Sequence, residues 1–438
     1  MRKDVNRYRA GLPALFCCLL LLTGPFATAQ SLTRQELESI FHNNPEMLYG
    51  YFFNYSTSGI HQVAPPKGYK PFYLSHYGRH GARRTHQEDL YKNVLGEMDK
   101  AFETDGLTDH GKDVREKVLL AYEEAQGLFG ELTPLGVQQH KEIARRMVEN
   151  YPQIFLRKGV VIDAVSSNVR RCIMSMAAST SQLLVMNPSM KLSLSTGDKY
   201  MDYIAYDSQE WQSFNADTSA WHQKLYEFEH QKIKPDRLLS SIFLSPEKVK
   251  DPVGFAISLR WIVANTNALN LGVNYDDIFT KEELKDIWET VNYKFYTLYG
   301  PNPENRGIPK QDACRLLAEM LADANAVLKQ NDGGAHLRYG HDVYIMKLMN
   351  LLQNQNNTSL TICPEDAALA WQDFRITPMA ANVQWVFYRN KKGDVLVKLL
   401  LNEVETRLPL ETECFPYYHW TDFRTYCEQL IDKWKPHQ

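Results

Sequence analysis

The sequence predicts an α/β fold with a mostly helical lobe inserted into it. In the first half, apolar runs typical of strands alternate with amphipathic helical segments, in the order strand, helix, helix, strand, helix. Residues 195–328 instead combine many Trp, Tyr, Glu and Lys residues with long helical patterns. Strand and helix then return near the C-terminus. We therefore predict an α/β core formed by residues 30–194 and 329–438, with the helical lobe at 195–328 between its two parts.

The elements of the first half have clear local signals. "SLTRQELESIF" predicts a helix with Leu32, Leu37 and Ile40 on one side and capping Ser and Thr residues before it. "PFYLSHYG" is typical of a buried strand, and "HQEDLYKNVLGEMDKAF" of a helix. Thr133-Pro134 begins the helix of "LTPLGVQQHKEIARRMVENY", because proline is tolerated at the first helical position. "VVIDAVSSN" then predicts a second strand, followed directly by a helix in "VRRCIMSMAASTSQLLV".

The second half closes the α/β pattern. "RLLAEMLADANAVL" is one of the helical patterns of the predicted lobe, and "AHLRYGHD" marks the return to a strand, with the helix "VYIMKLMNLLQ" behind it. "VQWVFYR" and "DVLVKLLL" predict a hairpin, because they are joined by "NKKG", whose glycine can take a positive φ. The last residues predict a helix.

The N-terminal residues have the pattern of a secretory signal peptide. A positively charged start is followed by the apolar run "LPALFCCLLLL" and by Ala27-Thr28-Ala29, which predicts cleavage after Ala29. The apolar run is short for a membrane span. We therefore expect 1–29 to be a signal peptide and the protein to be exported, either periplasmic or secreted, with no stable membrane span.

Charge and cysteine content exclude several classes of function. Removing residues 1–29 leaves 45 basic and 51 acidic side chains, a net charge of −6, which argues against a nucleic-acid partner. Five cysteines remain and no CxxC occurs, so a metal site built on sulfur is not expected. Cys414 and Cys427 are close enough in sequence to pair in an oxidising compartment, and the sequence leaves that pairing open.

Three places share one arrangement, in which a strand ends and charged side chains stand where a helix begins. They are Arg79-His80-x-x-Arg83, Arg170-Arg171 and His341-Asp342. The carboxyl ends of strands line the ligand crevice of open α/β sheets, and helix N-termini favour anions. If the three strands are neighbours, several arginines, two histidines and one aspartate meet at one edge.

Such a set is close to what metal-free phosphoryl transfer requires. Guanidinium groups bind phosphate oxygens in a fork, imidazole can attack phosphorus, and a carboxylic acid can protonate the leaving oxygen. Each motif also has a plain structural interpretation: a solvated loop, a solvated first helical turn, and an aspartate cap. His76, on the predicted strand, is interpreted as structural. Other routes to phosphate chemistry are missing, since the sequence has no GxxxxGK[ST] loop, CX5R motif or HExxH.

"RHGARRT" and "GHD" resemble the histidine acid phosphatases, branch 2 of the histidine phosphatase superfamily. "LTPLGVQQHKEIARRM" and "SSNVRRCIMSMAA" are similar to that family's intervening helix and second arginine segment, and "ITPMAANVQWVFYRNKKGDVLVKLLLNE" is especially similar to multiple inositol polyphosphate phosphatases. The similarity covers roughly residues 60–180 and 335–405. It implies a three-layer, phosphoglycerate-mutase-like core, with the helical lobe forming one wall of the site, and no cofactor or metal.

The resemblance also implies roles for individual residues. His80 would be the nucleophile and Asp342 the proton donor. The phosphate would be bound by Arg79, Arg83, Arg171 and His341, with Arg170 as the alternative to Arg171 in register.

Two departures from the family pattern stand out. Family members usually have Pro where this chain has Thr85, and inositol polyphosphate phosphatases typically have His-Ala-Glu where it has His341-Asp342-Val343. We expect an exported phosphatase acting on phosphomonoesters, with inositol polyphosphates such as phytate as substrates. A broad acid phosphatase acting on sugar phosphates and a non-catalytic phospholigand-binding protein are the alternatives.

Overall fold

A computed structural model describes residues 31–55, 61–216, 218–269, 271–330, 332–353 and 363–435. The predicted signal peptide at 1–29 lies outside the described residues. Among those that are described, no helix has both the length and the apolar character needed to cross a membrane.

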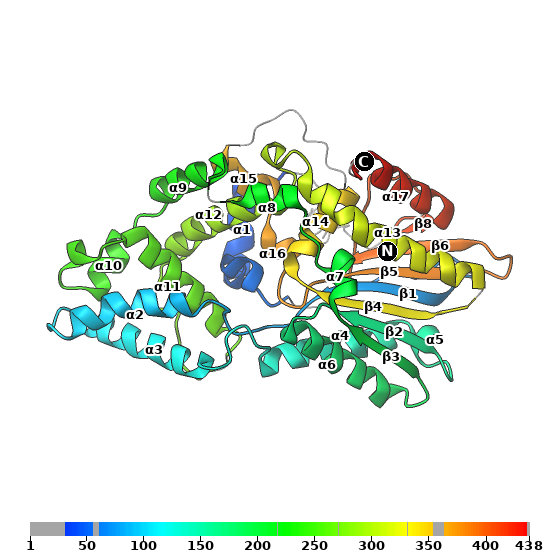
Figure 1. Ribbon diagram of the computed structural model, residues 1–438, viewed down its shortest axis with the longest axis horizontal. Coiled ribbons are helices and arrows are strands. Elements are labelled where there is room, and N and C mark those ends of the chain that lie inside the picture. The colour runs from blue at the N-terminus through cyan, green and yellow to red at the C-terminus, as the bar shows by residue number, and fades with distance from the viewer. Residues whose placement is uncertain are drawn as a thin grey trace, which may run out of the picture.

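One mixed sheet forms the centre of the α/β part (Figure 1). Its order is β3-β2-β4-β1-β5-β6-β7, and β8 also pairs with β6. The strands from β3 to β1 are parallel, whereas β5 runs antiparallel to β1. Their bounds are β1 Lys70–Arg79, β2 Val161–Ser166, β3 Lys191–Thr196, β4 Gly334–Gly340, β5 Asn382–Arg389, β6 Val395–Leu401, β7 Val404–Glu405 and β8 Tyr417–His419.

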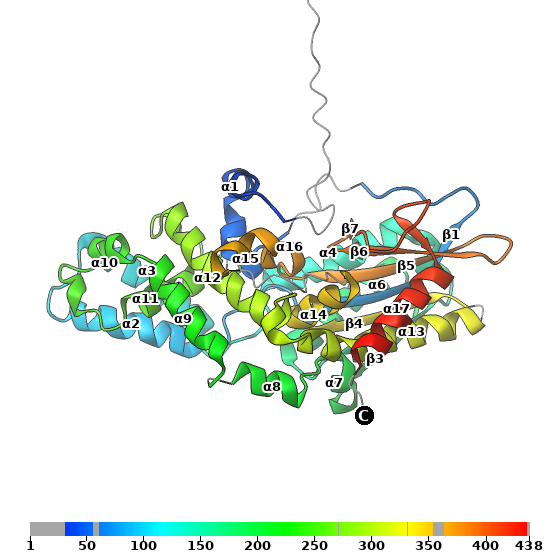
Figure 2. The ribbon, with the colours of Figure 1, turned by 90° about the horizontal axis from the view of Figure 1, so that it is seen from above.

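Helices cover both faces of this sheet, which confirms the predicted three-layer α/β core (Figures 1 and 2). Side chains alternate along β1, so Tyr73 and Tyr77 pack on one face while Leu74 packs on the other. The first face is covered by α13 (Ile308–Gln330), α14 (Asp342–Gln353) and α17 (Trp420–Trp434), and the second by α4 (Pro134–Asn150), α5 (Pro152–Phe155) and α6 (Arg170–Met186).

Local sequence signals set several of these boundaries. Helix α1 (Arg34–Asn43) begins with a capping box in which Thr33 and Glu36 bond each other's backbone N–H. Thr133 caps α4, with Pro134 at its first position, as predicted. The predicted hairpin is formed by β5 and β6, and Gly393 in its turn has φ +86°. Strand β1 continues one residue beyond the predicted end at Gly78, so that Arg79 is its last residue.

A helical layer lies beside the sheet (Figure 1). It packs α2 (Glu88–Phe102) against α11 (Pro252–Thr266), and α3 (Asp109–Ala125) against α10 (Asp236–Ile242) and α11. The same apolar cluster includes α1, the 3₁₀ segment η1 (Pro45–Phe52) and part of α12 (Lys281–Tyr299), and α9 (Ala220–Lys232) packs on α12. The shorter elements are α7 (Asp198–Ile204), α8 (Gln209–Asn215), η2 (Pro246–Lys248), η3 (Pro303–Asn305), α15 (Pro364–Ala370) and α16 (Asp373–Ile376).

Two features of this layer differ from the simple picture of one inserted segment. Helices α2 and α3 precede residue 195 but pack with the helices of the predicted lobe. Conversely, α13 begins inside the predicted lobe at Ile308 and packs on α14 and α17 of the core. The boundaries at 195 and 328 stay a prediction. The packing shows that helices from both sides of them share a layer.

The cysteine pairing considered from the sequence is not formed. Cys414 and Cys427 are both free thiols. Cys427 is buried on α17, where burial raises the pKa of its thiol well above the usual value.

Candidate active site

The strands that carry the three charged motifs are neighbours, as the predicted convergence requires. Strands β2, β4 and β1 lie side by side and run parallel. Arg79 at the end of β1 stands opposite Gly340 at the end of β4, and His80 N–H donates to the carbonyl of Gly340 at 3.0 Å. Ser167, just after β2, donates its N–H to the carbonyl of Tyr339 at 2.9 Å. Consequently, the residues following all three strands emerge at one edge of the sheet.

Arg79 is the most deeply buried charged residue at this edge of the sheet. Its side chain is fully buried, and Nη1 donates to the carbonyls of Tyr51 at 2.6 Å and Thr377 at 2.7 Å. Its Nη2 lies 2.9 Å from Oδ2 of Asp342, so the first and third motifs are joined by an ion pair. The guanidinium also stacks over the Tyr51 ring, 4.9 Å from its centroid. These contacts fix the orientation of the arginine before any ligand binds.

The remaining arginines of the motifs divide into two groups. Arg83 is buried and bonds the carbonyl of Arg84 at 2.9 Å, and Nη2 of Arg171 lies 3.4 Å from Nδ1 of His341. By contrast, Arg84 pairs with Glu124 on α3, and Arg170 is 81% exposed and pairs with Glu131 at 2.6 Å. This geometry favours Arg171 over Arg170 as the arginine of the second motif.

The buried Nε atoms of three arginines in this cluster lack an acceptor. Among the described residues, Nε of Arg79, of Arg83 and of Arg171 has no hydrogen-bond partner. Buried polar groups are normally paired, and three charged donors around one histidine strongly favour an anion. The positive charges of all three arginines also lower the pKa of His80.

His80 is held as a neutral imidazole. Burial, followed by the charges of Arg79 and Arg171, lowers the pKa of His80 well below its usual value. Its Nδ1 lies 2.9 Å from the carbonyl of Gly81, a distance at which Nδ1–H donates. That tautomer, assigned from the hydrogen bond, leaves the lone pair on Nε2.

His341 and Asp342 stand at the start of α14. The ring of His341 lies 5.7 Å from that of His80, and burial with the charge of Arg171 lowers the pKa of His341 to about 4. Burial alone would raise the pKa of Asp342, but the guanidinium groups of Arg79 and Arg83 outweigh it and lower that pKa. Asp342 is therefore a carboxylate in the unliganded site. The six residues singled out by the sequence are brought together at this edge.

His76 lies outside this cluster, on β1, where it is buried. Burial lowers its pKa to about 3, with His140 the next contribution. This agrees with a structural histidine rather than a proton-transfer group.

Sequence reasoning missed the groups that hold the turn after β1. Gly81 N–H donates to Oγ of Ser175 on α6, and Ala82 N–H donates to Oε1 of Gln139 on α4. Gly81 also needs to be glycine, since a Cβ there would lie 2.4 Å from the carbonyl oxygen of Gly136. Neither Ser175 nor Gln139 belongs to a charged motif, so nothing in the sequence separated them from ordinary helix residues.

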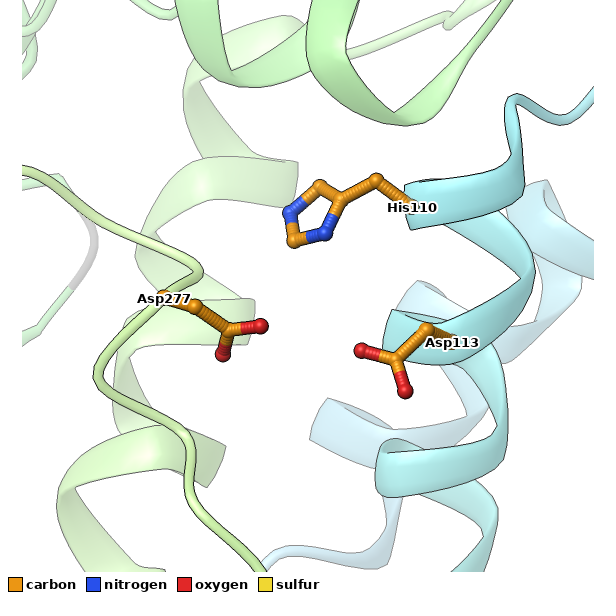
Figure 3. Close-up of side chains that lie close together, drawn as sticks. All are labelled: His110, Asp113 and Asp277. Carbon is orange, nitrogen blue, oxygen red and sulfur yellow. The ribbon is translucent and has the colours of Figure 1, made fainter.

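A second group of possible ligands lies on the helical layer, at some distance along the chain from the motifs. Figure 3 shows His110 and Asp113 of α3 facing Asp277. Nζ of Lys117 lies 2.8 Å from both carboxylates. This ammonium group already pairs with both carboxylates, so the cluster offers little to a further cation.

The fold and the charged cluster thus define an α/β protein with a buried basic site at the carboxyl edge of its sheet. The sequence family described as the histidine phosphatase superfamily (branch 2) matches residues 78–402. That range contains all three motifs and most of the described chain. The chain belongs to the histidine phosphatase superfamily, branch 2.

Solved structures with the same fold include known phosphatases. The multiple inositol polyphosphate phosphatase of Bifidobacterium longum, in complex with inositol hexasulfate, has a TM-score of 0.70 at 18% identity, covering 89% of this chain and 98% of that one. The phytase of D. castellii has a TM-score of 0.67 at 14% identity, with 88% and 85% covered. Hafnia alvei phytase in complex with tartrate has a TM-score of 0.52 at 12% identity, with 85% and 98% covered. No curated protein sequence matches the chain significantly. The family supports a phosphatase, and these neighbours share its fold.

Proposed function

We propose that the protein hydrolyses phosphomonoesters, with inositol polyphosphates as its main substrates, through a phosphohistidine at His80. The observation that carries the proposal is the set of three arginines whose buried Nε atoms lack acceptors, together with the neutral His80 whose pKa their charges lower. A phosphate group offers the oxygens that these donors require.

The first step forms a bond between Nε2 of His80 and phosphorus while the bond from phosphorus to the leaving oxygen breaks. Arg79, Arg83, Arg171 and His341 bind the phosphoryl oxygens and stabilise their charge. Asp342 in its acid form gives its proton to the leaving oxygen. The leaving group departs as an alcohol, and Asp342 becomes a carboxylate.

The second step removes the phosphate from His80. A water molecule gives a proton to the Asp342 carboxylate and attacks phosphorus, and the bond from phosphorus to Nε2 breaks. Inorganic phosphate leaves, while His80 and protonated Asp342 are restored. The two steps use one carboxyl group first as acid and then as base, and the protons balance over the cycle.

The preference for inositol polyphosphates rests on sequence and fold together. The "P-x-AAN" and "LLNE" segments resemble inositol polyphosphate phosphatases, and the B. longum neighbour is one of these enzymes. A phosphate-release panel with phytate, glucose phosphates and p-nitrophenyl phosphate tests this preference. Highest kcat/KM for phytate supports it, equal rates on all three would instead indicate a broad acid phosphatase, and binding without release would indicate a phospholigand-binding protein.

The rate should have an acidic optimum, below the usual pKa of histidine. Because its pKa is lowered, His80 stays neutral as pH falls through 6.5, the usual histidine pKa. The neutral form that attacks phosphorus is lost only when pH reaches the lowered pKa of the folded protein. Asp342 also has a lowered pKa, so its acid form becomes more abundant as pH falls. A bound phosphate dianion competes for Arg79 and raises that fraction. Rates on phytate from pH 3 to 9 measure this, and a rate that declines from pH 7 to 5 would contradict it.

Chelators should leave the rate unchanged, because the three arginines supply the positive charge that a metal would otherwise provide. The measurement is phosphate release before and after dialysis against EDTA. His110→Ala tests whether the cluster of Figure 3 contributes a metal, and its rate should equal that of the wild type. Loss of activity in EDTA that a divalent ion restores would show that the site needs a metal.

We also propose that the protein is exported, on the basis of the signal-like residues 1–29. Sequencing the N-terminus of the mature protein tests this, with Gln30 expected first.

A further inference from the structure

The turn that carries Arg83 is held by hydrogen bonds to its backbone from several elements. The core supplies most of them through α6, α4 and the segment before α4. These bonds join Gly81 N–H to Ser175 Oγ at 3.1 Å, Ala82 N–H to Gln139 Oε1 at 2.8 Å, Thr133 N–H to the Ala82 carbonyl at 2.9 Å, Arg84 N–H to the Glu131 carbonyl at 3.0 Å, and Gly130 N–H to the Thr85 carbonyl at 2.8 Å.

The backbone groups on either side of Arg84 are bound by one side chain, Asn265. Its Nδ2 donates to the carbonyl of Arg83 at 2.7 Å, and its Oδ1 accepts from the N–H of Thr85 at 3.0 Å. Asn265 is fully buried near the C-terminal end of α11, in the helical layer. The two bonds require the same orientation of the amide, since turning it over would set donor against donor and acceptor against acceptor.

We propose that Asn265 is a positioning residue for the phosphate-binding turn, through which helix α11 fixes where the Arg83 guanidinium points. This rests on the proposed function, because it takes Arg83 as a phosphate ligand. The amide immobilises the peptide groups before and after Arg84, and therefore the backbone from which the Arg83 side chain extends.

The residue types of the turn and of position 265 suit this arrangement. Thr85 provides an N–H that a proline at that position would lack, so Oδ1 of Asn265 has a donor to bind. Arg84 turns away from Arg83 and pairs with Glu124 on α3, which ties the same turn to the helical layer a second time. Only a side chain with one donor and one acceptor at fixed spacing satisfies both Arg83 and Thr85. Leucine satisfies neither, and serine reaches at most one.

The test compares Asn265→Leu and Asn265→Ser with a matched control. Asn187 follows the last residue of α6 and is also buried. Its Nδ2 donates to the carbonyls of Phe155 at 2.7 Å and Arg157 at 3.1 Å, and its Oδ1 accepts from Ser189 N–H at 3.1 Å. Asn187 and Arg171 lie at opposite ends of α6, about 25 Å apart along this helix of 17 residues. Asn187→Leu therefore removes the same kind of clamp without touching the turn.

Three quantities are measured for each variant: the thermal midpoint, kcat/KM on p-nitrophenyl phosphate, and the inhibition constant of inorganic phosphate. We expect both Asn265 variants to raise the inhibition constant about tenfold, with kcat/KM falling by roughly 10²-fold as the arginine is misplaced, and the serine variant being less affected. Asn187→Leu should lower the thermal midpoint about as much as Asn265→Leu does. Both of its kinetic constants should stay within about twofold of wild type.

Arg83→Ala separates this inference from the proposed function. If Arg83→Ala weakens phosphate inhibition but neither Asn265 variant does, Asn265 is only structural and the inference fails. Kinetic losses of the same size in Asn187→Leu lead to the same conclusion. If Arg83→Ala leaves phosphate inhibition unchanged, the assignment of Arg83 as a ligand fails instead. Should Asn265→Leu not fold, Asn265→Ser, which keeps a polar group at the turn, carries the same comparison.

Discussion

His80→Ala is expected to abolish turnover while leaving the fold intact. The variant loses the atom that bonds to phosphorus, and the arginines alone offer no second nucleophile, so the rate should fall by roughly 10³-fold or more. The fold should survive because, within the part of the chain that the structure describes, the His80 side chain makes one hydrogen bond, to the carbonyl of its neighbour Gly81. Phosphate release and far-ultraviolet circular dichroism measure the two effects.

The control for this variant is His110→Ala. His110 lies on α3, away from the charged motifs, so its loss should change neither the rate nor the spectrum. A His80→Ala protein that keeps more than a few percent of the wild-type rate would exclude the covalent mechanism. In that case water would attack the ester directly, and the arginine cluster would serve for binding alone.

The intermediate itself can be trapped. Wild-type protein mixed with radiolabelled substrate and quenched in alkali should retain label, because phosphohistidine survives alkali and is lost in acid. The label should be missing in His80→Ala and present in His110→Ala. Label that persists in His80→Ala would place the phosphoryl group on another residue.

Much of the fold could be predicted because its signals are local. Thr133-Pro134 fixed the start of α4, and the glycine of "NKKG" marked the hairpin turn. Helix α3 and strand β3 were missed for different reasons. Helix α3 has a regular buried stripe at Val114, Val118, Ala121 and Ala125, a signal that was available in the sequence. Strand β3 is an edge strand with little buried surface, so the apolar pattern that identifies a strand is weak there.

The candidate site, too, could be predicted only in part from the sequence. Motifs at strand ends located the charged residues, because the carboxyl ends of adjacent parallel strands must meet. The direction in which each charged side chain extends was harder to predict. Arg83 and Arg84 are neighbours in one motif, yet the charge of Arg83 lowers the pKa of His80 whereas Arg84 pairs with Glu124. The contribution of Asn265 was invisible, since it acts through backbone groups about 180 residues away that carry no sequence signature.

Asp342→Asn should separate the proton-donor role from the structural roles of the same residue. Asparagine is nearly the same size and keeps an oxygen, so it can still accept the hydrogen bond that Oδ1 of Asp342 receives from Val343 N–H at 3.0 Å. It cannot supply a proton as an acid does. The ion pair with Arg79 is also removed, but Arg79 remains anchored by the carbonyls of Tyr51 and Thr377. Phosphate binding should therefore persist, which the inhibition constant of inorganic phosphate checks.

The size of the effect should depend on the leaving group. An inositol alkoxide is a poor leaving group, so loss of its proton donor should lower kcat on phytate by ~10²–10⁴-fold. p-Nitrophenolate leaves without much help, so the rate of the first step, transfer of the phosphoryl group to His80, should fall far less on p-nitrophenyl phosphate. Because Asp342 also activates water, a burst of nitrophenol followed by slow turnover is expected from this variant. Equal losses on both substrates with no burst would mean that Asp342 only orients Arg79 and begins α14. The acid would then have to come from the helical layer that faces the site.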